Sequence, residues 1–278
     1  MIDDKVNIQE EAYPFLKLVN ERLKMFSSLI KEGYTIKDKL IILIYRLKLP
    51  LQAFNYFIGR RNSRKLFTNV YIKNRYGLFF CGDNFSSVFG VSSSCEPIMR
   101  EYLVLNEGVA IDMGSNCGMF TIPLAKMLGD RGRVISIEPD KKNIRLLKKN
   151  IILNGLKNVT VVERGCFSKE GRMTFYLDEL GTGGHSLLKG RGAKETIHVD
   201  TIDNILKNLK IYHVDLIKMD VMGVELEAFK GAKQTLKKSH PKIVFELLNK
   251  EDKERVYSFL SKYGYKIKQI TDWNHFAV

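Results

Sequence analysis

A turn bracketed by two glycines stands where an apolar run meets an amphipathic helix, in the segment VAIDMGSNCGMFTIPLAKMLG (residues 109–129). Asp112, Gly114, Asn116 and Gly118 alternate through this turn. A turn that opens a helix favours an anion through its free N–H groups. The segment lacks the Gly-Lys-Ser/Thr ending of a P-loop and the G-x-G-x-x-G spacing of a dinucleotide fingerprint. The turn therefore cradles a phosphate, holds a nucleoside or is simply a tight strand-to-helix connection.

Glu138 ends the next apolar run, twenty residues after Gly118. A carboxylate at the end of the second strand of an open α/β sheet can accept both hydroxyls of a ribose. The turn and this carboxylate together indicate a ribose-bearing ligand with one modest anionic group and no pyrophosphate clamp. S-adenosylmethionine, which has a ribose and a single carboxylate, fits this description.

Three further side chains are candidates for acting on an acceptor hydroxyl. Asp220 ends a predicted strand beside the turn, where it would be a general base, orient the acceptor, bind a metal, or only cap the next helix. His185, in the glycine-rich segment GTGGHSLLKGRG (residues 181–192), is either a base that titrates near neutrality or an exposed loop histidine. Glu246 ends another predicted strand and either lines the acceptor pocket or anchors a loop. No His, Cys and carboxylate set has metal-ligand spacing, so we expect no metal.

Alternating strands and helices must position these residues. The apolar patterns predict strands at 109–113, 133–137, 159–163, 215–219, 242–248, 265–270 and 276–278, with helices at 120–128, 141–154, around 226–236 and at 251–263. Such alternation predicts an α/β fold with a mainly parallel sheet and helices on both faces. In this class the ligand lies beyond the carboxyl ends of the strands.

The first 66 residues read as a helical extension. An apolar stripe over 12–30 predicts one helix, Thr35-x-x-Asp38 is a capping box, and the apolar stretch 40–58 predicts two helices or a kinked one. Short strands are expected across 69–91. Arg60, Arg61, Arg64 and Lys65 form a basic cluster. The extension is either a cap packed on a catalytic domain (residues 67–278), where it could also make a homodimer contact, or an amphipathic surface for an anionic membrane.

Charge and cysteine content limit the partners. The chain has 278 residues and a net charge of +14, from 45 Lys and Arg against 31 Asp and Glu. A basic chain suits nucleic acid, anionic lipid or an anionic substrate, although a lysine-rich solvated surface is the simpler interpretation. Four scattered cysteines, the acidic start and the lack of an apolar run of ~20 residues predict a cytoplasmic protein without disulfides.

The turn resembles motif I of the class I methyltransferases, and Asp112-x-Gly114-x-Asn116-x-Gly118 is similar to the FkbM-type enzymes in particular. Glu138-Pro139 resembles the next motif of that family. VDLIKMDVMGVELEAFKGA (residues 214–232) resembles its second hallmark, and PKIVFE and CEPIMREYL (with Glu96-Pro97) match further family positions. One departure is Met222, where the family usually has Glu. The resemblance runs from about residue 69 to the end of the chain.

The resemblance implies a seven-stranded Rossmann-like sheet, S-adenosylmethionine as methyl donor, and O-methylation of sugar or natural-product hydroxyls. Gly114 and Gly118 would let the backbone approach the methionine portion, Asn116 would bond near it, and Glu138 would bind the ribose. The adenine would lie near Cys166 and Phe167. The implied cofactor-binding residues are Asp112, Gly114, Ser115, Asn116, Gly118, Glu138, Pro139, Cys166, Phe167 and Asp220.

Two other functions stay open. Residues 112–126 and LLKKNIILNG (residues 146–155) also resemble tRNA-modifying enzymes, which makes an RNA methyltransferase one alternative. No Asn-Pro-Pro-Tyr-like motif follows the fourth strand, where Asp220-Val221-Met222-Gly223 stands instead. A non-catalytic scaffold at a membrane surface is the other alternative. The partner predicted by the main interpretation is a small-molecule or glycan acceptor.

Overall fold

The structure is a computed structural model that describes residues 23–24, 26–57, 69–82, 85–176, 187, 193–247 and 250–278. It separates into two compact units, residues 1–95 and residues 96–278. The predicted boundary between extension and catalytic domain at residue 66 stays a prediction. The basic cluster at 60–65 lies outside the described residues.

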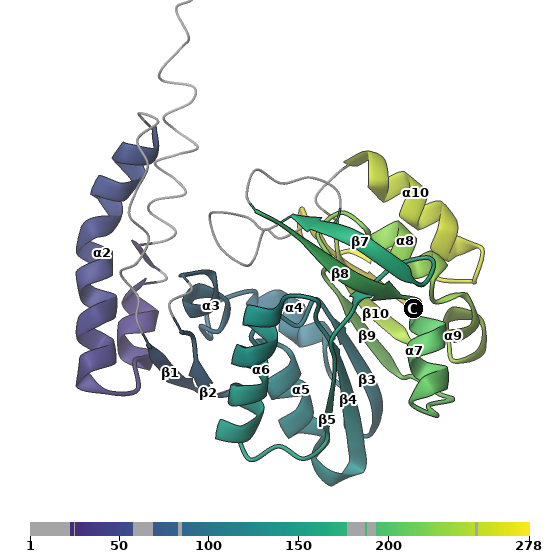
Figure 1. Ribbon diagram of the computed structural model, residues 1–278, viewed down its shortest axis with the longest axis horizontal. Coiled ribbons are helices and arrows are strands. Elements are labelled where there is room, and N and C mark those ends of the chain that lie inside the picture. Colours follow the sequence, from purple (N-terminus) through teal and green to yellow (C-terminus); the bar gives the residue numbers. More distant parts are fainter. Residues whose placement is uncertain are drawn as a thin grey trace, which may run out of the picture. The chain divides into compact units, whose positions relative to one another are not determined.

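The second unit is built on a seven-stranded sheet in the order β11-β12-β10-β9-β3-β4-β5 (Figure 1). The strands are β3 (Gly108–Met113), β4 (Gly132–Ile137), β5 (Val159–Val162), β9 (Leu216–Met219), β10 (Lys242–Glu246), β11 (Ile267–Gln269) and β12 (Asn274–Ala277). β12 runs antiparallel to both of its neighbours, and the β5-β4-β3-β9-β10 pairs are parallel. The predicted α/β class with a mainly parallel sheet is confirmed.

Helices cover both faces of this sheet (Figure 1). Alternate residues of the central strands, such as Ala110 and Val134, pack against α4 (Pro97–Tyr102) and α5 (Thr121–Leu128). The intervening residues, such as Ile111 and Ile135, pack against α7 (Ile202–Asn208), α8 (Glu225–Lys230), α9 (Lys233–Lys238) and α10 (Lys250–Ser261). Burial on both faces explains why β3 and β9 are nearly continuous apolar runs.

The strand register brings the predicted site positions to one edge of the sheet. In β3, Asp112 pairs with Ser136 of β4 and with Lys218 of β9, and Met113 pairs with the last residues of both neighbours. Gly114, Glu138 and Asp220 therefore follow directly after three adjacent strands that end level. α6 (Lys141–Leu153) begins just beyond, where the Asp140 side chain accepts hydrogen bonds from the amides of residues 142 and 143.

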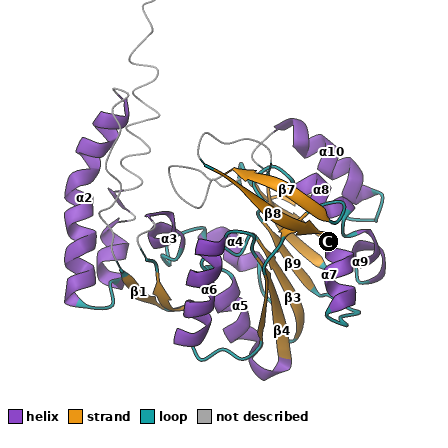
Figure 2. Cartoon of the chain, viewed as in Figure 1, coloured by secondary structure: helices purple, strands orange, loops and turns teal. Residues whose placement is uncertain are grey.

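A smaller sheet, β6-β8-β7, was not expected from the sequence (Figure 2). It consists of β6 (Gly165–Cys166), β7 (Gly171–Tyr176) and β8 (Lys194–Asp200). β7 and β8 pair antiparallel over six residues each. Much of both strands is exposed, as in GRMTFY and KETIHVD, so the apolar alternation that identifies half-buried strands is weak here.

The first unit holds a helix at 23–32 (residue 25 is not described), α2 (Ile36–Phe57), β1 (Tyr71–Asn74), β2 (Gly77–Phe80) and α3 (Phe85–Gly90). The Thr35/Asp38 capping box is present, because each residue accepts a hydrogen bond from the backbone of the other. Of the two alternatives for 40–58, two helices or one kinked helix, the first is wrong, since α2 continues through Pro50. Residues 85–90 are helical and not extended, with Ser87, Val88 and Val91 buried at helical spacing.

Candidate functional site

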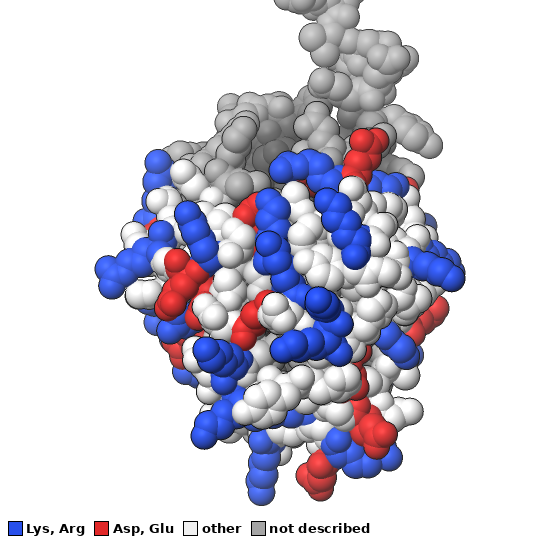
Figure 3. Space-filling model, turned by 90° about the vertical axis from the view of Figure 1, so that its right-hand side faces the viewer, with Lys and Arg blue, Asp and Glu red and all other residues white. Residues whose placement is uncertain are grey.

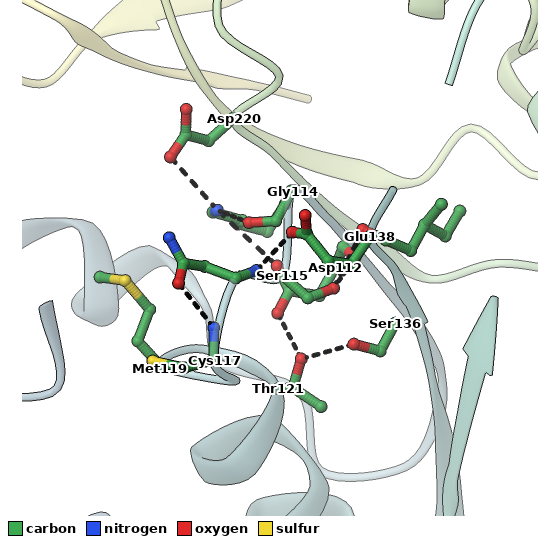
Figure 4. Close-up of polar contacts among 12 residues, drawn as sticks. Asp112, Gly114, Ser115, Cys117, Met119, Thr121, Ser136, Glu138 and Asp220 are labelled. Atoms are coloured by element: carbon green, nitrogen blue, oxygen red, sulfur yellow. Dashed lines mark hydrogen bonds and ion pairs between the residues drawn. The ribbon is translucent and has the colours of Figure 1, made fainter. Parts of the chain in front are cut away.

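The glycine turn lies tightly against the end of β9 (Figure 4). Gly114 has a φ of +72°, and a Cβ built there would lie 1.8 Å from the backbone carbonyl oxygen of Asp220. Gly118 has a φ of +95°, and its Cβ would meet the Leu147 side chain at 3.0 Å. Ser115 is buried, and its hydroxyl donates to the backbone carbonyl oxygen of Asp112 at 2.7 Å. Only glycine fits at position 114, because the backbone is left-handed there and a side chain would overlap the Asp220 carbonyl oxygen.

The amides of this turn donate hydrogen bonds within the chain. Those of residues 114 and 115 donate to the Ile137 carbonyl, at 3.0 and 3.2 Å, and that of Gly118 donates to the Ser115 carbonyl at 2.8 Å. The Asn116 amide donates to Glu138 Oε2 at 2.7 Å, and that of residue 117 donates to Asn116 Oδ1 at 2.8 Å. The expected free N–H groups for an anion are therefore not found at 114–118. A phosphate cradle is disfavoured as a result.

Glu138 is a buried carboxylate at the end of β4, with a side chain only 4% exposed. Its Oε2 accepts the Asn116 amide, and its Oε1 accepts the Asp140 amide at 3.0 Å and the Asn143 side-chain amide at 3.3 Å. Burial raises the pKa of Glu138 to about 7, although these hydrogen bonds act in the opposite direction. This carboxyl group therefore changes charge close to neutral pH.

Asp112 lies beneath the turn and is fully buried. Its Oδ2 accepts a hydrogen bond from the Thr121 hydroxyl at 2.6 Å, and the Thr121 and Ser136 hydroxyl oxygens are 2.9 Å apart (Figure 4). Burial raises the pKa of Asp112, against the lowering effects of Lys218 and Thr121. Thr121 therefore ties the Asp112 side chain to α5 and, through Ser136, to β4.

Lys218, in the middle of the buried strand β9, was missed as a site residue. Its Nζ lies 3.7 Å from Asp112 Oδ1, 3.6 Å from Asp220 Oδ2 and 3.5 Å from the Gly114 carbonyl oxygen. The ammonium also lies 4.9 Å from the centre of the Phe120 ring. Burial by itself lowers the pKa of Lys218, but the surrounding carboxylates outweigh it and raise that pKa. The signal in the sequence was a single charged residue within the apolar run LIKM.

Besides Asp112, three further carboxyl groups act electrostatically on this ammonium. Asp220 follows β9, and its side chain is 28% exposed, so it remains reachable. Glu246 ends β10, and burial together with the charges of Asp220 and Glu96 raises its pKa to about 8. Glu96 precedes α4 with a φ of +47° and makes no capping bond, and burial raises its pKa as well. Within the described ranges, no group of three or more His, Cys, Asp or Glu residues is arranged to hold a metal.

The remaining candidates differ in their placement. Cys166 is buried in β6, and burial and the charges of Asp200 and Glu138 raise the pKa of its thiol, which stays protonated. Phe167 follows it, with its amide bonded to the Asp200 carbonyl at 2.9 Å. Pro139 lies between Glu138 and the helix cap. His185 falls outside the described residues, so its role stays a prediction.

The residue that differs from the usual family Glu, Met222, lies in a left-handed turn. Met222 has a φ of +56° and is followed by Gly223 with a φ of +96°. Glu225 is buried, and its Oε1 accepts the Gly223 amide at 3.0 Å. Burial raises the pKa of Glu225 to about 7. This carboxyl group therefore holds the turn that begins α8.

Comparison with known proteins identifies the family. The model of the methyltransferase FkbM domain matches residues 112–267. The chain is 27% identical over 136 residues to a Sulfurisphaera tokodaii protein named "Probable cobalt-precorrin-6B C(15)-methyltransferase (decarboxylating)", and the match covers 44% of this chain and 70% of that protein.

The solved structures that are similar to this chain include two further methyltransferases. The FkbM methyltransferase of Methylobacillus flagellatus is 16% identical with a TM-score of 0.48, over 93% of this chain and 59% of that one. This chain therefore spans less than two thirds of the length of that protein. Precorrin-6y C5,15-methyltransferase of Geobacter metallireducens is 15% identical with a TM-score of 0.43, over 65% and 85% of the two chains. Because the FkbM model matches more than half of the sequence and includes both the glycine turn and Asp220, the chain belongs to the FkbM methyltransferase family.

Proposed function

We propose that the chain is an S-adenosylmethionine-dependent O-methyltransferase that acts on a hydroxyl of a sugar, glycoconjugate or natural product. The observation that carries the proposal is the level ending of β3, β4 and β9, which brings Gly114, Glu138 and Asp220 to one edge. Glu138, which is proposed to bind the cofactor, and Asp220, which is proposed to act on the acceptor, then lie on either side of the glycine turn.

The residues at this edge fit S-adenosylmethionine better than a dinucleotide. The buried Glu138 carboxylate can accept a ribose hydroxyl at Oε2, which keeps one lone pair beside the Asn116 amide, whereas Oε1 already accepts two hydrogen bonds. Gly114 has no side chain, so the cofactor can approach its backbone closely. The amides of the turn that would hold a pyrophosphate already donate hydrogen bonds within the chain. Asp112, Ser115 and Asn116 hold the turn in shape. Cys166 and Phe167 are proposed to contact the adenine.

When bound, S-adenosylmethionine supplies an electrophilic methyl group on its sulfonium. The chain must place the acceptor oxygen in line with that methyl group and take up the hydroxyl proton. Asp220 is proposed as the base, because it is the partly exposed carboxylate beside the turn, and its Oδ2 lies 3.6 Å from the Lys218 ammonium. Glu246, with its pKa near 8, is protonated at neutral pH and can donate a hydrogen bond. Carboxyl groups that include both hydrogen-bond donors and hydrogen-bond acceptors suit a substrate with several hydroxyl groups.

Methyl transfer from labelled S-adenosylmethionine to a panel of sugars, glycosides and RNA tests this function. Asp220→Asn should lower kcat by roughly 10²–10⁴-fold, the range for a general base. The matched control is Asp130→Asn, at an exposed aspartate next to α5. Unchanged turnover in Asp220→Asn would remove it as the base.

The bond formed in the product tests the acceptor atom. The Sulfurisphaera relative is named as a C-methyltransferase, so a methyl group on carbon is the competing outcome. NMR of the product distinguishes an O-methyl from a C-methyl group. A methylated RNA or a C-methyl product would contradict the proposed acceptor while leaving the cofactor assignment intact.

A further inference from the structure

Helix α2 of the first unit carries large aliphatic side chains on its exposed side. Ile36, Leu40, Leu43, Ile44 and Leu47 are between 37% and 78% exposed. The opposite side packs inward: Asp38, Ile42 and Tyr45 are buried, and the Tyr45 ring lies 5.9 Å from that of Phe26. The helix is thus apolar on both sides, and only one of them faces the core of its unit.

The exposed aliphatic residues form one continuous stripe. Their spacing of i, i+4, i+7, i+8 and i+11 keeps them within an arc of about 100° at 100° per residue. Exposed aliphatic residues scattered singly are ordinary, but a contiguous stripe on a helix marks an interaction surface. We call these five residues the α2 stripe.

Basic residues border the stripe on both sides. At 100° per residue, Lys37 falls on one border, and Lys39 and Arg46 fall on the other. Both lysines are exposed. The acidic residue of this helix segment, Asp38, faces inward, where its Oδ1 accepts the Tyr71 amide at 3.0 Å. An apolar stripe between two basic borders is the pattern of a helix that lies in the interface of a membrane.

We infer that the α2 stripe docks this protein on an anionic membrane surface. The aliphatic side chains would enter the acyl boundary, while the basic borders reach the phosphate level. The charge of this part of the chain agrees, because residues 1–100 contain 16 Lys and Arg against 9 Asp and Glu. No helix in the described part of the chain is long and apolar enough to cross a membrane.

The basic side chains on another face of the molecule have a different distribution. On the face of the molecule shown in Figure 3, Lys and Arg are spread among acidic and uncharged residues. A spread of this kind raises non-specific attraction to any anionic surface. The combination of a basic border with an apolar stripe is therefore the feature that singles out α2.

Flotation of the full chain with vesicles tests the inference. Vesicles of neutral phosphatidylcholine are compared with vesicles that contain about one third phosphatidylglycerol, at low and high salt. We expect binding to the anionic vesicles alone, weakened by salt. Leu40→Glu with Leu47→Glu should lower the partition coefficient at least tenfold, because two aliphatic anchors become charged. Lys37→Gln with Lys39→Gln should lower it several-fold.

The matched control is Ile152→Glu, at an aliphatic residue of α6 that is 78% exposed, like Ile36. This variant should bind vesicles as the wild type does. Equal binding to neutral vesicles, or no loss in the Leu40→Glu and Leu47→Glu variant, would overturn the inference. The same holds if the stripe variant changes only the sedimentation coefficient or only RNA binding. Cofactor titration of the same variants is expected to be normal, so this test and that of the proposed function fail independently.

Discussion

Cofactor affinity should rise with pH through the ionisation of Glu138. The pKa of this buried carboxyl group is about 7 in the ligand-free protein. If the ribose hydroxyls are bound by the ionised form, the competent fraction is about 0.09 at pH 6 and about 0.91 at pH 8. The dissociation constant of S-adenosylhomocysteine should therefore fall about tenfold over this range, or about 1.4 kcal/mol. The affinity rises with pH because the ligand binds the deprotonated form of Glu138.

Calorimetric titrations of wild type and Glu138→Gln between pH 6 and pH 8 measure this slope. The variant cannot ionise, so its affinity should be low and should lack the Glu138 part of the slope. Titration of groups on the ligand is common to both proteins and cancels in the comparison. Glu225→Gln is the matched control, because Glu225 also has a pKa of about 7 but holds the α8 turn. A slope that persists in Glu138→Gln, or vanishes in Glu225→Gln, would refute the reasoning.

Three further predictions concern the framework of the site. Gly114→Ala should abolish cofactor binding in calorimetry, because its Cβ overlaps a carbonyl oxygen, whereas Gly155→Ala meets nothing within 4 Å and should cost only about 1 kcal/mol of backbone strain. Lys218→Met should lower the free energy of unfolding by about 3–5 kcal/mol, since it leaves the buried Asp112 uncompensated, and urea midpoints should recover partly when Asp112→Asn is added. Protonated Glu225 is favoured in the folded state, so stability should fall as pH rises from 4.5 to 7, and Glu225→Gln should remove about 3 kcal/mol of that fall; an unchanged pH dependence would contradict this.

The sequence was sufficient to predict the sheet and the edge at which the site lies. The apolar runs that end at Met113, Ile137 and Met219 are β3, β4 and β9, and their register brings the following residues together. This succeeded because parallel strands buried on both faces leave unbroken apolar runs. Helix and strand ends shifted by one to three residues, as expected where local signals are weak. The single helix expected around 226–236 is two helices, α8 and α9.

The contacts that the sequence did not reveal are long-range ones. The charges of Glu96 and Lys218 act on one another although the two residues lie 122 positions apart, and Glu96 has a left-handed backbone at φ +47°. No local pattern encodes this interaction. Lys218 looked like an interruption of an apolar strand, and only the register shows that its ammonium is surrounded by carboxylates. The internal hydrogen bonds of the glycine turn likewise depend on Glu138 and Ile137 from the next strand.

The central claim is that the edge formed by the glycine turn and Glu138 holds S-adenosylmethionine. The most direct test is calorimetric titration of the full chain with S-adenosylmethionine, S-adenosylhomocysteine and, as a control, NAD. We predict that the first two bind with one site per chain, that NAD does not, and that Gly114→Ala binds none of them. Binding of NAD alone, or undiminished binding of S-adenosylmethionine to Gly114→Ala, would contradict this assignment.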